Sequence, residues 1–175
     1  MNKIINIKKK KSIDDIKVFK DKVFVPVDVK FENVHLKELN ALIGSELFSK
    51  NDLYINSKTL WELMQPLGNA GSHNYHELTP EDIYYALNDI VHPECVIKTK
   101  NERFAVIPTH ISSFEEPLMV IIELNSSLIV NKNANINKIV TIYPKSNLDE
   151  YLDKLDEKDI LYKKMSINTG SNCLN

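Results

Sequence analysis

The stretch GNAGSHNYHELTPEDIYYALNDIVHPECVIKT, residues 68–99, combines a polar loop, a sharply specified helix, a proline and a strand. Thr79 is placed to cap the N-terminus of the helix, and Pro80 suits its first turn. Asp82 can reach back to the cap residue and complete a variant of the capping box. The sequence therefore predicts a helix that begins directly after Thr79.

This helix carries apolar residues on one face and ends at a proline. Ile83 and Leu87 recur at helical spacing, so this face should pack inward. The residue before Pro93 is pushed out of the α region, which ends the helix and begins a strand. The loop ahead of the helix carries His73 and His76, and the rest of the chain has to indicate their role.

Composition and charge are typical of a globular protein of one domain. The chain has 175 residues, a hydrophobic fraction of 43% and a formal net charge of -2 at pH 7. This charge gives no overall attraction to nucleic acid, so RNA binding would need a local basic patch. Cys95 and Cys173 form no metal-spaced cluster or disulfide framework, and no apolar run approaches the roughly 20 residues that span a bilayer. We therefore predict a cytoplasmic protein that has no membrane partner.

The two ends of the chain differ from its middle. Residues 1–22 contain the lysine block Lys8–Lys11, and we expect a basic N-terminal arm that is solvated rather than bound to RNA. Residues 23–165 carry the helical and extended patterns and should form a single α+β domain. Residues 166–175 are small and polar, which predicts a flexible C-terminal tail.

The order of the expected elements sets the fold class. The expected segments are helices at 35–43, 57–67 and 80–91, strands at 52–55, 95–99, 103–108, 118–124 and 136–143, a late helix from 148 and a last strand at 159–165. Ser57 and Asn147 should cap helices, and Gly44 should end one. The run 118–124 is apolar on both faces, which predicts the central strand. We predict an α+β fold with N-terminal helices packed on a meandering antiparallel sheet of four to five strands and one late helix.

The candidate chemistry comes from a scattered set of side chains. The sequence shows no metal-ligand spacing, no glycine-rich phosphate loop and no nucleophile elbow. The set comprises His73, His76, Arg103, His110, Thr141, Tyr143, Lys145 and Tyr162. Such residues suit a reaction that needs proton transfer and a fixed cation, which is what metal-free RNA cleavage requires.

The roles follow from the side-chain types. Histidine titrates near neutral pH and can act as the acid or the base. Lys145 or Arg103 could stabilise the charge on the phosphorane, and Thr141 and Tyr143 should project from the same face of a strand. Each residue also has a simpler interpretation, because loop histidines are usually exposed and Tyr143 would fit a half-buried sheet position equally well.

Four segments carry a family resemblance: INSKTLWELM, HNYHELTPEDIYYALNDIVHPECVI, IVTIYPK and DILYKK. Together, over about residues 52–164, they resemble phage-encoded nucleases of the barnase–EndoU–colicin–RelE-like class. Members of this class occur as toxin domains in prophages and at the ends of phage head-morphogenesis proteins. The resemblance implies helices followed by a four- or five-stranded antiparallel sheet, and RNA cleavage without a metal.

The resemblance also implies a site. It matches His76, with His73 as a competing alignment, and it matches Thr141, Tyr143 and Lys145; these are the expected catalytic residues. We add Arg103 and Tyr162 as substrate-binding residues, and we expect no cofactor and no metal. The expected activity is that of an endoribonuclease toxin acting on RNA, such as tRNA, with a cognate inhibitor as a further partner. The alternative is a non-catalytic phage protein on the same fold that binds and inhibits a host protein.

Overall fold

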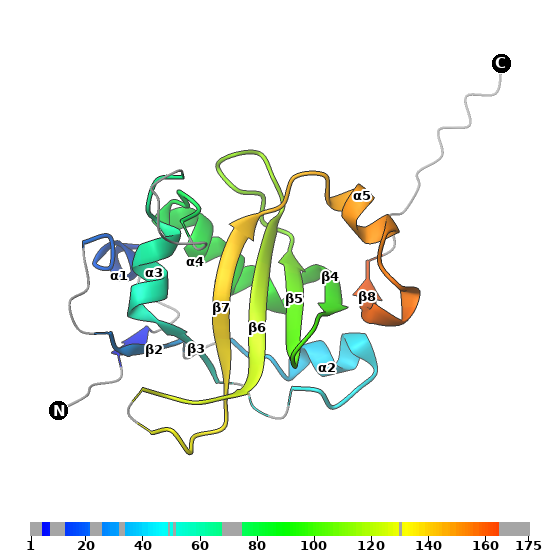
Figure 1. The fold of residues 1–175 in the computed structure, drawn as a ribbon, viewed down its shortest axis with the longest axis horizontal. Helices are drawn as coiled ribbons and strands as arrows, with labels where there is room; N and C mark the ends of the chain where they lie inside the picture. Colours follow the sequence, from blue (N-terminus) through cyan, green and yellow to red (C-terminus); the bar gives the residue numbers. More distant parts are fainter. Residues whose placement is uncertain are drawn as a thin grey trace.

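The computed structural model describes residues 5–7, 13–21, 26–31, 34–48, 50, 52–67, 75–129 and 131–164. Within these ranges the helices are α1 (Asp14–Lys17), α2 (Glu38–Ile43), α3 (Ser57–Leu63), α4 (Pro80–Asn88) and α5 (Leu148–Asp153), with short 3-10 turns at Asp89–Val91 and Glu157–Asp159. The strands are β1 (Ile5–Ile7), β2 (Asp28–Phe31), β3 (Leu53–Asn56), β4 (Pro93–Lys98), β5 (Arg103–Pro108), β6 (Leu118–Ser126), β7 (Ile136–Pro144) and β8 (Ile160–Lys163). Figure 1 shows these elements as one curved sheet flanked by helices.

The described strands form one eight-stranded sheet in the order β1-β2-β3-β7-β6-β5-β4-β8. The α+β class is confirmed, but the expected number of four to five strands was too small. The pairs β1–β2 and β3–β7 are parallel, and the remaining pairs are antiparallel. The strands β1, β2, β3 and β8 are only three or four residues long, and β3 and β8 pair with strands far along the chain, so local periodicity could not predict how they join the sheet.

The central strand lies where the apolar run predicted it. β6 pairs with β5 on one side and β7 on the other. Leu118, Val120 and Ile122 are fully buried on the helix-covered face, whereas Ile121 and Glu123 on the opposite face are only half-buried. The run is therefore covered on one face and partly open on the other.

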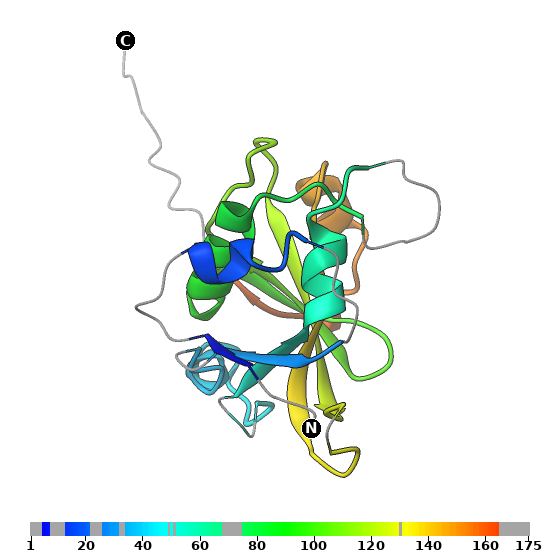
Figure 2. The same cartoon turned by 90° about the vertical axis from the view of Figure 1, so that its left-hand side faces the viewer.

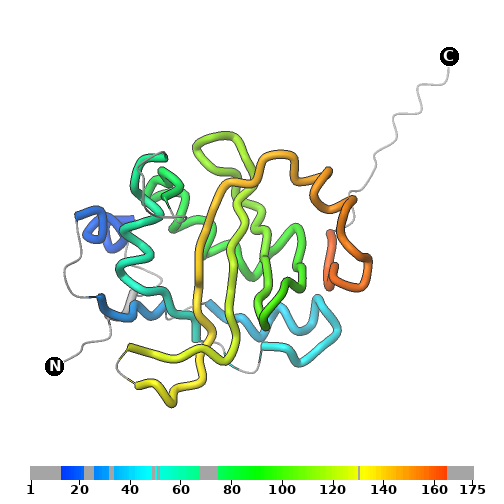
Figure 3. Tube along the Cα trace, viewed as in Figure 1, coloured from blue at the N-terminus to red at the C-terminus, as the bar shows by residue number. Residues whose placement is uncertain are grey.

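Two groups of helices explain this difference. The main core lies between one sheet face and α1 to α4, and α4 crosses behind β7 and β6 in Figure 1. As predicted, Ile83 and Leu87 of α4 point into this core. The second face is covered over β4 and β5 by α5, whose Leu152 packs on Cys95 and Met119. In Figure 3 the trace of α5 lies at the opposite end of the sheet from α1.

The helix ends test the predicted caps. Thr79 and Asp82 form the complete capping box of α4, and Gly44 ends α2 with a φ of 63° in the left-handed region, so both predictions are confirmed. Ser57 is not a cap: the Asn56 side chain caps α3, and the buried Ser57 hydroxyl accepts a hydrogen bond from the Val27 amide. The expected cap of α5 by its preceding asparagine is also wrong, because that residue has a positive φ and makes no side-chain bond.

The N-terminal segment is joined to the domain more closely than we expected. β1 pairs with β2, and Ile16 and Phe19 at and after α1 are buried in the main core. Figure 2 shows β1 and β2 at this end of the molecule, below α1 and α3. Thus the described parts of the predicted arm, residues 1–22, pack on the domain, because they supply apolar side chains and a strand that complete its edge. The block Lys8–Lys11 and the predicted tail 166–175 lie outside the described residues.

Candidate active site

The edge of β7 becomes available where β3 ends. β3 pairs with β7 over only three positions, the last of them Ile139, and the chain then turns into α3. The segment that precedes α4 lies against the end of α3 instead: the Glu77 and Leu78 amides donate hydrogen bonds to the carbonyls of Gln65 and Leu63. This crossing carries His76 to the side of β7.

His76 meets two of the predicted residues at this edge. Its Nε2 lies 3.2 Å from the Thr141 hydroxyl, and its ring centroid lies 5.7 Å from that of Tyr143. Thr141 and Tyr143 alternate along β7 with the fully buried Ile142, so both project from the face opposite the main core, as their spacing predicted. Residues 65 positions apart in the sequence thus share one small site.

Burial shifts the pKa values of both His76 and Tyr143. Removal from water lowers the pKa of His76 below its ordinary value of 6.5, so the imidazole is neutral at pH 7 and can accept a proton. Burial, helped by the nearby Tyr151, raises the pKa of Tyr143 above 10.0, so its hydroxyl keeps its proton. That hydroxyl donates to the sulfur of Met119 at 2.9 Å, and a thioether is a weak acceptor. The Tyr143 proton can therefore be turned toward a better acceptor.

Lys145 supplies a cation two residues beyond Tyr143. Its ammonium lies 4.7 Å from the centroid of the Tyr151 ring, a cation–π arrangement. Among the described residues, no carboxylate lies within ion-pair distance of this half-buried lysine. The other half-buried lysines of the described chain differ, because Lys30 pairs with Asp52 and Lys138 lies near Asp28. Within the part of the chain that the structure describes, Lys145 is thus a cation without a carboxylate partner.

Tyr151 was not predicted as part of the site. It comes from α5, and burial raises its pKa above 10.0, with a smaller contribution from the nearby Cys95. Its aromatic face supports the ammonium of Lys145, which lies six positions earlier in the sequence. A tyrosine on an amphipathic helix is normally a packing residue, so the sequence contained no signal that distinguished it.

The remaining predicted residues lie elsewhere. Arg103 lies on the same sheet face but further from the site, opposite Glu123 of β6. Its Nε and Nη2 donate to one oxygen of Glu123 at 2.9 and 2.7 Å. Tyr162 of β8 packs against the main core on the opposite face. His110 lies 3.6 Å from the Asp82 carboxylate, and His73 lies outside the described residues.

The described residues show neither a metal-binding cluster nor a membrane-spanning helix. They contain no group of three or more His, Cys, Asp or Glu side chains that could hold a metal ion. None of the described helices is long and apolar enough to cross a membrane.

The comparison with protein families matches residues 69–166 to the phage MuF C-terminal domain. This is more than half of the chain. The chain belongs to the phage MuF C-terminal domain family. Comparisons with curated proteins and with solved structures give no match.

The MuF C-terminal domain match supports the phage origin expected from the sequence, but it does not indicate a nuclease toxin family. The matched segment runs from the loop before α4 to just beyond β8. It therefore contains His76, Thr141, Tyr143 and Lys145, as well as Tyr151. The three N-terminal strands and α1 to α3 lie outside the match, although α3 helps to fix the segment that carries His76.

Proposed function

We propose that this MuF C-terminal domain is a metal-independent endoribonuclease whose active site lies at the free edge of β7. The contact of His76 with Thr141 and Tyr143 carries the proposal, because it joins a neutral imidazole to hydrogen-bonding groups on β7, and Lys145 directly follows this strand. Cleavage of RNA by attack of the 2′-hydroxyl on the adjacent phosphodiester needs these three groups: a base, a proton donor and a cation.

The reaction begins with proton removal from a ribose 2′-hydroxyl. The free ring nitrogen of neutral His76 accepts this proton, and the 2′-oxygen attacks the adjacent phosphorus. The bond between phosphorus and the 5′-oxygen breaks, and that oxygen takes the proton of the Tyr143 hydroxyl. The products are a 2′,3′-cyclic phosphate and a 5′-hydroxyl, and water restores the protonation of both side chains.

The other two residues act on charge and position. Lys145 stabilises the extra negative charge of the phosphorane, and it is suited to this role because it has no carboxylate partner among the described residues. The Thr141 hydroxyl, 3.2 Å from Nε2, fixes the orientation of the imidazole. A prearranged base and cation need little reorganisation when charge develops.

Cleavage of total RNA or tRNA in excess EDTA tests the function. The wild-type protein should leave 5′-hydroxyl ends, which accept a labelled phosphate without prior dephosphorylation. His76→Ala should lower the rate by about 10²–10⁴, the usual cost of losing a general base. His92→Ala is the matched control, because His92 is exposed and lies at the other end of α4, beside β4.

The proposal fails if the wild-type protein cleaves no RNA under these conditions, or if His76→Ala and His92→Ala cleave at the same rate. A folded protein without cleavage would favour the alternative of a phage protein that binds and inhibits a host protein. Binding to host proteins would then be the property to measure.

A further inference from the structure

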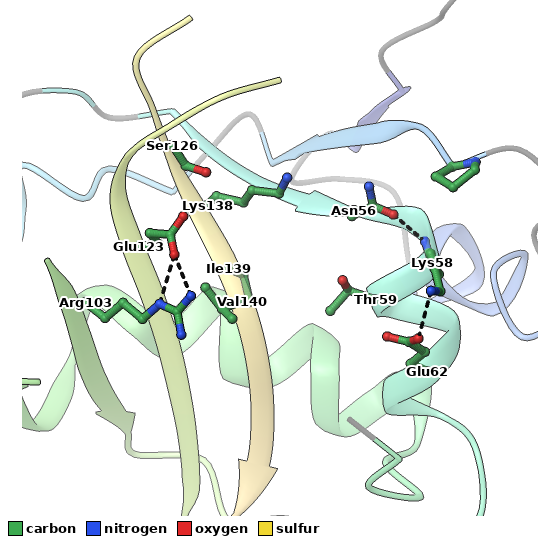
Figure 4. A pocket seen from close by; sticks show the side chains of 11 residues that line it. Asn56, Lys58, Thr59, Glu62, Arg103, Glu123, Ser126, Lys138, Ile139 and Val140 are labelled. Atoms are coloured by element: carbon green, nitrogen blue, oxygen red, sulfur yellow. Dashed lines mark hydrogen bonds and ion pairs between the residues drawn. The ribbon is translucent and has the colours of Figure 1, made fainter. Parts of the chain in front are cut away.

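A groove of about 400 Å³ lies beside the candidate active site and is not used by it. Its walls come from α3 on one side and from β6 and β7 on the other (Figure 4). The polar side chains that line it include Lys58, Glu62, Arg103, Glu123 and Lys138. It therefore brings three cations and two carboxylates together.

The groove lies next to the candidate active site along β7. Its lining ends at Ile139 and Val140, and Thr141 is the next residue. Arg103, Glu123 and Lys138 occupy neighbouring positions across three strands, on the face that also carries Thr141. From Lys138 to Thr141 the strand advances about 10 Å at about 3.3 Å per residue. A bound chain that reaches His76 would pass over the groove.

Arg103 is held so that part of its guanidinium stays available. Two of its N–H groups go to a single oxygen of Glu123, whereas a guanidinium has five N–H donors. Its side chain is 40% exposed, and Figure 4 shows it over β6, facing the groove. A guanidinium fixed by a carboxylate and with donors left over is well placed to bind a phosphate.

Lys58 and Lys138 supply the remaining positive charge of the groove. Lys58 of α3 lies 3.5 Å from Glu62, and its side chain is 60% exposed whereas that of Glu62 is 12% exposed, so the ammonium reaches solvent and can also contact another anion. Lys138 lies 3.9 Å from the fully buried Asp28, whose Oδ1 accepts no hydrogen bond among the described residues. The cations thus lie on both walls of the groove.

We propose that this groove binds the sugar–phosphate backbone of the RNA next to the scissile nucleotide, with Arg103 and Lys58 as the phosphate contacts. The inference rests on the proposed function for its substrate class, but it concerns binding rather than cleavage. An acidic protein segment is the other class of chain that such a groove could take. RNA is favoured because the groove lies along β7 next to the candidate active site and places its cations on two walls, as a phosphate backbone requires.

Binding of an RNA 12-mer that carries 2′-O-methyl groups tests the inference, since such RNA cannot be cleaved by 2′-hydroxyl attack. Fluorescence anisotropy should show that Arg103→Gln and Lys58→Gln each weaken binding about tenfold, the equivalent of one charge-assisted hydrogen bond. Each variant should also reduce the slope of log K against log salt by about 0.7, the value for one phosphate contact on a single strand. Lys98→Gln is the control, because Lys98 is exposed at the end of β4.

Weaker RNA binding by a variant has to be distinguished from loss of its folded structure. Arg103→Gln and Lys58→Gln each remove an ion-pair partner from a glutamate, Glu123 and Glu62 respectively, so the thermal midpoint of both variants is measured. The inference is overturned if Lys58→Gln and Arg103→Gln bind RNA like Lys98→Gln, or if the wild type binds no RNA. Weaker binding by both variants in a protein that cleaves nothing would support the groove and refute only the proposed nuclease activity.

Discussion

Replacement of Asp82 should lower the free energy of unfolding, because this residue joins two segments near the candidate site. Its carboxylate is 3% exposed and accepts hydrogen bonds from the amide and hydroxyl of Thr79 at 3.0 and 2.8 Å. It also accepts hydrogen bonds from the amide and hydroxyl of Ser113, both at 2.8 Å. One side chain thus joins the start of α4 to the loop between β5 and β6, only a few residues after His76.

The magnitude follows from the groups that lose a partner in Asp82→Ala. Loss of the capping interaction costs about 1 kcal/mol. The two bonds from Ser113 go to a charged acceptor and cost about 1 kcal/mol each, because water can replace part of each bond at this half-open loop. The free energy of unfolding should fall by about 3 kcal/mol, which corresponds to a decrease in Tm of about 6–12 °C for a chain of this size.

Urea unfolding followed by circular dichroism measures this change, with Glu81→Ala as the matched control. Glu81 occupies the same first turn, but its side chain is 45% exposed, and its ion pair among the described residues is a surface pair with Lys17 at 3.7 Å. Its removal should cost less than about 1 kcal/mol. If Asp82→Ala is no more destabilising than Glu81→Ala, the carboxylate does not join the two segments and the argument is refuted.

Asp82 should also account for part of the loss of stability at acid pH. Burial acts to raise the pKa of Asp82, but hydrogen bonds from Thr79 and Ser113 outweigh it and hold the pKa below 3.8. The contribution of Asp82 to stability is therefore complete above pH 3.8 and is lost as the pH falls through the lowered value. In Asp82→Ala this component of the pH dependence should be absent from unfolding curves.

Three further predictions concern the site itself. Tyr151→Leu should lower kcat about tenfold with little change in KM, because Lys145 loses the ring that positions its ammonium, whereas Tyr151→Phe should retain activity; equal rates for both variants would contradict a positioning role. Because burial lowers the pKa of His76 below 6.5, cleavage should rise with pH through that lowered value and be constant at neutral pH. His76 should also contribute stability that is complete above pH 6.5 and lost as the pH falls through the folded pKa, so unfolding of His76→Gln should lack this dependence.

Local sequence determined the elements whose signals lie within a few residues. The capping box of Thr79 and Asp82, the left-handed Gly44 and the position of β6 all followed from short-range rules, because caps and apolar periodicity act within one or two turns. The alternation that places Thr141 and Tyr143 on one face followed for the same reason.

Tertiary structure decided what lies beside these elements. Local patterns could not indicate that β3 would pair with only part of β7, that His76 would lie beside the remaining part, or that the Tyr151 ring would lie against Lys145. It also could not show that Arg103 would pair with Glu123 in a separate groove. Each of these contacts joins residues on different elements, and their pairing depends on how the sheet and helices pack together rather than on any propensity of the residues involved.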